Sequence, residues 1–396
     1  MNNKSRLKLF FLKVRALLKL VSFMFCEWNK IKKARVIFFF PYYHTGGAEK
    51  VHLNIVKAVS DHKNYIFFTD ISYSDGFKKA FYSFADVYEV YEFLNRNYAI
   101  RKFFTKILIS RMNDSKNLLS VIGCHSGFYY EILPHLRNTI KKHDLTHAFV
   151  KPDKGGIEIF SLPYVKYLDR RIVIDIKGKQ DLDSLYNHEG ISPKFKKRIQ
   201  IIRNGLETSG KFAKTKDSTI FYVGFVGRWA KEKRPELYVE IANELKQLYP
   251  KIEFVMAGPN FQENEQAICD AGIINLGEIK DQHILDEWYS KMNVILVTSY
   301  REGFPMVIME SMMYGVIPVS TNVGSLNEHI TDNFNGFLIE NESSLEEIKN
   351  KFIEKIIYLY KNNEEQLVIS NNAKEYALNN FGIENFTKKY RLLLLD

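Results

Sequence analysis

The chain of 396 residues is poor in cysteine and proline, with only three and ten of them. Cys26, Cys124 and Cys269 are odd in number, lie far apart, and form neither a C-x-x-C pair nor another metal-ligating spacing. This usage argues against a disulfide scaffold and favours reduced thiols in a cytoplasmic protein. Because prolines are few and Ser/Gly tracts are lacking, long disordered linkers are not expected.

The sequence also lacks an uninterrupted apolar run of the roughly 20 residues that cross a bilayer. Near the N-terminus the longest such run is only Leu20–Cys26. Lys13, Arg15 and Lys19 break the apolar segment that a secretory signal needs. Hydrophobic residues still make up 46% of the chain, which suits two large cores better than one.

Acidic residues are scarce at the N-terminus. Residues 1–35 hold ten Lys/Arg and one acid, Glu27, a local charge of +9, so the rest of the chain carries only +1 of the total +10. A broad nucleic-acid-binding face is therefore not expected.

Residues 1–30 have the pattern of a basic amphipathic helix. We expect this helix to contact an anionic membrane surface through residues 4–25. The alternative is a helix packed on its own domain, a second subunit or another protein partner. The apolar stripe comprises Leu7, Phe10, Phe11, Val14, Leu17, Leu18, Val21 and Phe25, and the basic stripe comprises Lys4, Lys8, Arg15 and Lys19.

Short apolar runs alternate with helical patterns along the rest of the chain, which predicts an α/β protein with parallel sheets. The pattern restarts near Thr219, after the turn signal Asn204-Gly205. We therefore expect a Rossmann-like domain over 31–205 and a second over 206–379, with a helix over about 380–396 packing back on the first. Strands are expected within residues 34–43, 65–70, 86–93, 118–127, 145–150, 171–178, 219–229, 251–260, 271–279, 293–300 and 315–321.

Two such doubly wound domains facing each other would leave a central cleft at the carboxyl ends of their strands. Gly46 and Gly47 follow the first strand and precede a helix, where the backbone can approach a ligand and helix N–H groups can bind an anion. A plain tight turn would look the same. Arg228 and Lys233 follow a strand of the second domain and suit a diphosphate, although a solvated basic loop is the alternative.

Two glutamates flank a Gly-Pro turn in the stretch "EGFPMVIME". Pro305 is expected at the first position of a helix, so that the turn at Gly303-Phe304 exposes N–H groups to an anion. Glu302 and Glu310 are eight residues apart and cannot form an i,i+4 pair. We therefore predict that one binds a sugar and the other a ribose, rather than that they act as nucleophile and acid/base.

The motifs "GGAEK", "VGRWAKEK", "VMAGPN", "NLGEI" and "SYREGFPMVIMESMMYG" occur in this order. Together they resemble the retaining GT-B-fold glycosyltransferases of family 4, also called glycosyl transferases group 1. The resemblance is dense over about 219–340 and patchier over 35–205. It implies hexosyl transfer from a nucleoside diphosphate sugar, most often a UDP sugar, to a glycan or polyprenyl-linked acceptor, without a metal or other cofactor.

The resemblance also assigns roles to individual residues. Arg228 and Lys233 would hold the donor diphosphate, and Glu310 the ribose hydroxyls. Glu302 would bind the donor sugar, and His125 would lie near the reacting sugar unless it is only structural. Donor-binding positions further include Gly46, Gly47, Gly277, Glu278, Ile279, Gly303, Phe304, Pro305, Met306 and Val307, with the segment 277–279 beside the nucleobase.

The chain departs from the family pattern in two places. Arg234-Pro235 follows Lys233 where glycine is common, and Pro259 replaces a second glycine. Asp181 and Asp183 form a D-x-D pair that holds a metal in another glycosyltransferase fold. Here the pair opens a helical pattern, so helix-capping acids are the favoured interpretation.

The favoured hypothesis is a glycosyltransferase that acts at the inner face of the plasma membrane in bacterial surface glycan synthesis. The alternatives are a GT-B nucleotide-sugar epimerase, and a non-catalytic nucleotide-sugar-binding partner of a glycosyltransferase complex.

Overall fold

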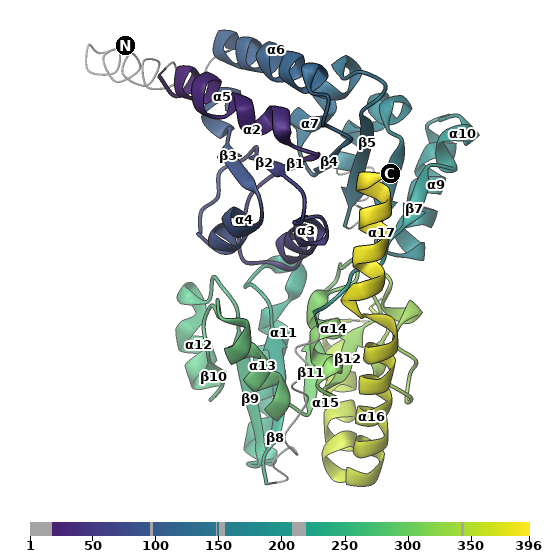
Figure 1. Ribbon diagram of the computed structural model, residues 1–396. Helices are drawn as coiled ribbons and strands as arrows, with labels where there is room; N and C mark the ends of the chain where they lie inside the picture. The colour runs from purple at the N-terminus through teal and green to yellow at the C-terminus, as the bar shows by residue number, and fades with distance from the viewer. Residues whose placement is uncertain (1–17, 96–97, 148, 150–154, 208–218, 342–343) are drawn as a thin grey trace. The chain divides into compact units, whose positions relative to one another are not determined.

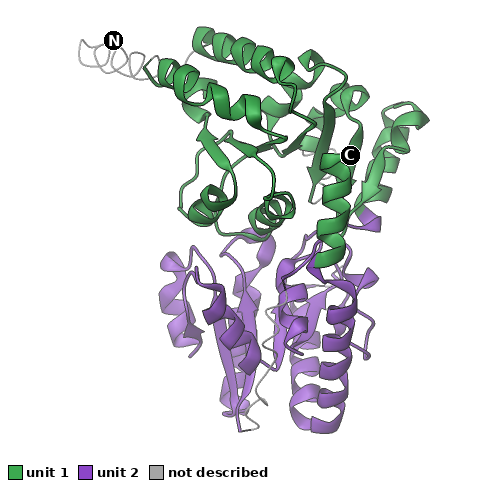
Figure 2. Cartoon of the chain, viewed as in Figure 1, with its two compact units in different colours: residues 1–174, 178–203, 384–396 green, residues 175–177, 204–383 purple. Residues whose placement is uncertain are grey.

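A computed structural model describes residues 18–95, 98–147, 149, 155–207, 219–341 and 344–396. The chain divides into two compact units, shown in Figure 2. Unit 1 comprises residues 1–174, 178–203 and 384–396, and unit 2 comprises 175–177 and 204–383. Each unit is built on one parallel β-sheet, as the sequence predicted (Figure 1).

The sheet of unit 1 has the strand order β3-β2-β1-β4-β5-β6-β7 in the described part of the chain. Its central strands are buried at every position, because runs of Val, Ile and Phe are covered on both faces of a parallel sheet. The strands are β1 (Val36–Phe40), β2 (Asn64–Phe68), β3 (Asp86–Glu89), β4 (Ser120–Cys124), β5 (Lys141–Thr146), β6 (Arg170–Val173) and β7 (Ile199–Ile201).

Helices separate most of these strands along the chain. The longer ones carry apolar residues on the side that packs against the sheet. The helices of unit 1 are α2 (Trp28–Lys33), α3 (Gly47–Ala58), α4 (Lys78–Phe84), α5 (Tyr91–Asn95), α6 (Tyr98–Asp114), α7 (Gly127–Ile132), α8 (Ile157–Phe160), most of α9 (Ile176–His188), α10 (Pro193–Lys196) and nearly all of α17 (Ile383–Leu395).

Strand β5 begins four residues before the expected run at 145–150. Its first four residues are "KKHD", so the strand lacks a hydrophobic pattern. Lys142 and Asp144 are buried with internal partners: the Lys142 ammonium donates to the carbonyls of Arg137 and Ile140 at 3.0 Å each. Asp144 is 0% exposed and accepts from the guanidinium of Arg171, which is 2% exposed.

The sheet of unit 2 has the order β10-β9-β8-β11-β12-β13 among the described residues. Short β7 in unit 1 and β13 here were not expected from the sequence. The strands are β8 (Phe221–Val226), β9 (Ile252–Ala257), β10 (Ile274–Asn275), β11 (Val294–Val297), β12 (Ile317–Thr321) and β13 (Phe337–Ile339). The helices are α11 (Pro235–Leu248), α12 (Glu265–Asp270), α13 (Gln282–Lys291), α14 (Met306–Met313), α15 (Leu345–Lys361) and α16 (Asn363–Asn380).

The last helix, α17, returns to unit 1, coloured green in Figure 2. The backbone carbonyl of Leu394 accepts a 2.7 Å hydrogen bond from the buried hydroxyl of Ser120 at the start of β4. Arg391 forms a two-pronged contact with Asp61, at 2.7 and 2.8 Å. The chain passes from unit 1 into unit 2 at 203/204, close to the expected boundary at 205/206, and returns at 383/384.

The described part of the N-terminal helical segment, residues 18–26, packs on unit 1 by one face. Leu20 and Phe23 are 2% and 1% exposed, and the Phe23 ring lies 5.2 Å from that of Phe104. The predicted apolar stripe contains neither residue. Its members in the described part are instead exposed: Leu18 by 65%, Val21 by 43% and Phe25 by 81%.

The rest of the stripe, from Leu7 to Leu17, lies outside the described residues. Among the residues that are described, no helix has the length and apolar character needed to span a bilayer.

Candidate functional site

The candidate donor site lies at the carboxyl edge of the unit 2 sheet. Strands β8 and β11 are neighbours at the middle of the sheet, where the strand order reverses direction. Ligands of doubly wound sheets bind at this topological switch point. Arg228 and Lys233 follow β8, and Glu302 follows β11, so the fold brings all three to the two loops that flank it.

Two hydrogen bonds of the Thr298 hydroxyl fasten these loops together. It donates to the carbonyl of Lys233 at 2.7 Å and to that of Arg234 at 3.0 Å. The backbone N–H of Tyr300 donates to the carbonyl of Glu232 at 3.0 Å. The backbone of the short 3-10 helix Lys231–Lys233 is thereby fixed before any ligand arrives. Sequence reasoning did not single out Thr298, although it follows β11 directly.

Lys233 forms an ion pair with Glu302. The ammonium lies 2.5 Å from Oε1, and the two side chains are only 24% and 10% exposed. The Ser299 hydroxyl donates to the same Oε1 at 2.6 Å. The pair therefore sets one cation and one carboxylate side by side at the switch point, each in a defined position.

The Arg228 side chain is 58% exposed, and its Nη2 lies 2.6 Å from Oε1 of Glu232. Burial raises the pKa of Glu232, but the hydrogen bond from Arg228 and the positive charges of Arg228 and Lys233 outweigh it and lower that pKa overall. Glu232 is thus held as a carboxylate between two cations, which leaves the loop with a net positive charge.

Arg234 occupies the position where the family commonly has glycine. Its backbone has φ +48°, ψ +53°, in the left-handed region that glycine adopts without steric cost. The guanidinium donates to Asn341 at 2.6 Å and lies 5.4 Å from the centre of the Tyr300 ring. These contacts hold Arg234 in place, and the loop keeps the conformation that a glycine would give it.

The turn at Gly303-Phe304 packs tightly against the loop after β12. The carbonyl of Gly303 accepts from the backbone N–H of Ser325 at 3.1 Å. A Cβ on Gly324, which has φ +61°, would lie 2.1 Å from that carbonyl oxygen. The Phe304 ring is buried, with its centre 4.2 Å from that of His329. The Phe304 side chain is therefore turned away from a ligand, whereas Gly303 is partly exposed.

Helix α14 follows this turn and begins at Met306. Pro305 is its N-cap residue, with ψ 128°, rather than its first helical residue, so the predicted position was off by one. Met306 is buried and Val307 is partly exposed. Glu310 is the fifth residue of the helix, and its Oε2 accepts a 3.0 Å hydrogen bond from the buried hydroxyl of Tyr289.

The segment predicted to lie beside the nucleobase also sits at this edge, directly after β10. Gly277 adopts φ +62°, and its carbonyl accepts from the N–H of Gly258 at 2.8 Å. Gly258 has φ +150°, and a Cβ there would lie 1.9 Å from the carbonyl oxygen of Gly227. Glu278 and Ile279 are partly exposed beside it.

Gly46, Gly47 and His125 belong to unit 1, at the carboxyl edge of its sheet. Gly46 caps α3, and Gly47 is exposed at its first position. His125 follows β4 at φ +50° and is exposed, with its ring parallel to that of His147 at 6.1 Å between centres.

Asp181 and Asp183 lie in the middle of α9. The prediction that they cap a helix N-terminus is therefore wrong. Asp183 pairs with Lys179 one turn away, at 3.3 Å.

The segment that holds this site is similar to known proteins. Residues 208–376 match the family model of the glycosyl transferases group 1. The match covers most of unit 2. The matched segment contains every predicted donor residue except the two glycines of unit 1.

Curated relatives match over shorter stretches. The chain is 28% identical over 129 residues to a D-inositol 3-phosphate glycosyltransferase of Paenarthrobacter aurescens, covering 30% of this chain and 32% of the relative. It is 30% identical over 155 residues to a Campylobacter jejuni α-1,4-N-acetyl-D-galactosaminyltransferase named for an undecaprenol-linked acceptor, covering 37% and 42%. The chain therefore spans about a third of the length of the curated relatives it matches.

Solved structures match over nearly the whole chain. The pneumococcal O-GlcNAc transferase GtfA, in complex with UDP and GlcNAc, has a TM-score of 0.72 at 14% identity, covering 91% of this chain and 98% of that one. Anabaena Alr3699/HepE, in complex with UDP and glucose, has a TM-score of 0.70 at 15% identity, covering 90% and 98%. The two parallel sheets of the chain thus match those of GT-B structures.

Proposed function

We propose that this protein transfers a hexose from a nucleoside diphosphate sugar, UDP being the favoured nucleotide, to a glycan or polyprenyl-linked acceptor. The Lys233–Glu302 pair carries this proposal. A diphosphate needs a fixed cation and a sugar needs a hydroxyl acceptor, and the pair provides both at the switch point. The family match and the UDP complexes of the structural neighbours support the same chemistry.

In this mechanism the main contribution is electrostatic. As the sugar–oxygen bond breaks, negative charge builds on the leaving diphosphate, and fixed cations stabilise it where water is excluded. Lys233 and Arg228 supply those cations, so the departing group requires no metal. Glu302 and Glu310 act as binding groups for sugar and ribose hydroxyls. We further propose that the configuration at the anomeric carbon is retained.

A thermal-shift experiment tests the donor site. UDP at saturating concentration should raise the unfolding temperature of the full chain, because a ligand that binds only the folded state stabilises it. The Lys233→Ala variant should lose most of this shift. If UDP, ADP and GDP all leave the unfolding temperature unchanged, the proposed donor class is wrong. Assignment of the product anomer by NMR tests retention.

We also propose that the protein works at the inner face of the plasma membrane, in synthesis of bacterial surface glycans. Leu18, Val21 and Phe25 support this, because they expose the predicted membrane-facing stripe while the opposite face is packed on unit 1. Deletion of residues 1–30 would also remove core residues. Replacing these three residues by serine is therefore the better test.

Wild-type protein should co-sediment with vesicles that contain anionic lipid, and the triple-serine variant should remain in solution. Leu248→Ser in α11 is a matched control, since Leu248 is 65% exposed but lies outside the stripe. Equal sedimentation of the triple variant and the wild type would contradict the membrane contact.

A further inference from the structure

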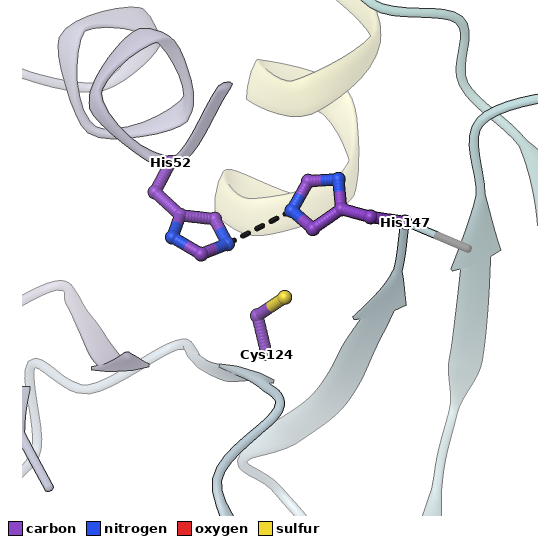
Figure 3. Close-up of side chains that lie close together, drawn as sticks. All are labelled: His52, Cys124 and His147. Carbon is purple, nitrogen blue, oxygen red and sulfur yellow. Dashed lines mark hydrogen bonds between the residues drawn. The ribbon is translucent and has the colours of Figure 1, made fainter. Parts of the chain in front are cut away.

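Three potential metal ligands converge in unit 1, outside the donor site. They are His52 of α3, Cys124 at the end of β4 and His147 just after β5. One ligand atom of each lies within 4.8 Å of the other two. Figure 3 shows the thiol of Cys124 pointing toward the two imidazole rings, whose Nε2 atoms are 2.9 Å apart.

The two imidazoles already face each other through their Nε2 atoms, the atoms that would bond to a metal. In the metal-free state one Nε2 must carry a proton and donate to the other. Nδ1 of His52 is buried and lacks a hydrogen-bond partner, so this arrangement leaves a polar atom unsatisfied.

The surroundings of the thiol favour a cation. Cys124 is 1% exposed, and the negative charges of Asp144 and Glu49 act on its surroundings. These carboxylates attract a positive ion. Asp144 pairs with Arg171, and Glu49 lies on α3, one turn before His52.

We propose that His52, Cys124 and His147 form a binding site for a zinc ion. Two imidazole nitrogens and one thiolate are a ligand set that zinc accepts, with a fourth position left for water or another ligand. Zinc bonds of 2.0–2.3 Å place tetrahedral ligands roughly 3.3–3.8 Å apart, so the cluster needs only small shifts to close on the metal. On binding, Cys124 releases its proton to solvent. The imidazole that carried its proton on Nε2 loses that proton to solvent and takes one up on Nδ1, so that both rings bond through Nε2.

The bound ion would tie α3 to the ends of β4 and β5, at the carboxyl edge of the unit 1 sheet. Its ligands belong wholly to unit 1. The inference is independent of the proposed transfer reaction, and its test uses binding and stability rather than turnover.

Metal analysis of the purified full chain after exposure to zinc and removal of free metal should find close to one zinc per chain. Saturating zinc should raise the unfolding temperature by about 5 °C or more, because the ion binds only the folded arrangement. Cobalt in place of zinc should give the ultraviolet thiolate-to-cobalt absorption that reports a cobalt–sulfur bond.

Cys124→Ser and His147→Gln should abolish the stoichiometric zinc and the temperature shift. Cys269→Ser and His188→Gln are matched controls, because both residues are exposed and lie outside the cluster. His147 is partly exposed, so its variant should fold even if that of buried Cys124 does not.

Zinc below about one tenth per chain, or zinc retained equally by His147→Gln, would overturn the proposal. So would a cobalt complex that lacks the thiolate absorption. In those cases the two imidazoles share a hydrogen bond and nothing more.

Discussion

The ammonium of Lys233 lies 2.5 Å from a carboxylate oxygen of Glu302, although 69 residues separate them along the chain. The contact joins the loop after β8 to the loop after β11. A donor that places its diphosphate at Lys233 and its sugar at Glu302 exchanges this ion pair for two new interactions. The charges are thus positioned in advance, which reduces the reorganisation needed when the ligand binds.

Lys233→Ala should lower kcat by about 100- to 1000-fold, since it removes a cation that stabilises the leaving diphosphate. Lys231→Ala is the control, because Lys231 is exposed on the same short 3-10 helix. Steady-state kinetics with the UDP sugar that binds would measure the effect. Near-normal turnover of a folded Lys233→Ala protein would remove Lys233 from the site.

Glu310→Gln should weaken UDP binding about tenfold, because a carboxylate accepts hydrogen bonds from ribose hydroxyls more strongly than an amide does. Binding of inorganic pyrophosphate, which has no ribose, should be unchanged. Isothermal titration with both ligands checks the assignment. Equal losses for UDP and pyrophosphate would place Glu310 at the phosphates instead.

Arg234→Gly should keep the stability of the chain within about 1 kcal/mol. It relieves left-handed backbone strain of about 1–2 kcal/mol but loses the contacts to Asn341 and Tyr300. Arg234→Ala loses the same contacts and keeps the strain, so it should be less stable than the glycine variant. Urea unfolding of the two variants gives the comparison. An alanine variant as stable as the glycine variant would contradict the strain argument.

Asp144→Asn should destabilise the protein by about 3–5 kcal/mol, because it leaves the charge of Arg171 buried without compensation. Glu131→Gln is the matched control. Glu131 pairs with Arg101 at 2.6 Å, but both side chains are substantially exposed, so its loss should cost at most about 1 kcal/mol. Denaturant unfolding measures both, and similar costs would contradict the prediction.

The stability of unit 1 should fall as pH drops from about 6.5 toward 4. Burial lowers the pKa of His143 in the folded state to about 4, so the unfolded state binds more protons across this window. The contribution of neutral His143 to the free energy of unfolding is complete above the pKa of the unfolded state, about 6.5. At pH 5 this contribution is smaller by about 2 kcal/mol. His143→Leu should flatten this dependence in urea unfolding at pH 7 and 5. If the free energy of unfolding changed with pH as steeply in the variant as in the wild type, groups other than His143 would cause the pH dependence.

Much of the fold followed from hydrophobic runs, but the polar and the shortest strands did not. Lys142 and Asp144 gave the start of β5 the polar pattern of a loop. Their burial could not be predicted, because burial of a charge depends on partners distant in sequence, such as Arg171 for Asp144. Strands β7 and β13 have three residues each, too few for a pattern to distinguish them.

The candidate donor residues could be named from their motifs, yet their geometry could not. Nothing in the spacing showed that Thr298 would fasten the lysine loop, or that Arg234 would adopt a glycine conformation. The proposed zinc ligands His52, Cys124 and His147 have no metal-site spacing at all. They meet because β4 and β5 end at the edge of the sheet where α3 begins.

The return of α17 to unit 1 has a consequence for synthesis on the ribosome. The residues that cover Ser120 and pair with Asp61 are made after unit 2, so unit 1 cannot finish folding until residues 384–396 have been synthesised. Along the sequence, nearly all of unit 2 lies between two parts of unit 1, and a bridge between Leu206 and Gly382 brings its ends together. Unit 2 can therefore complete its fold before α17 has been made.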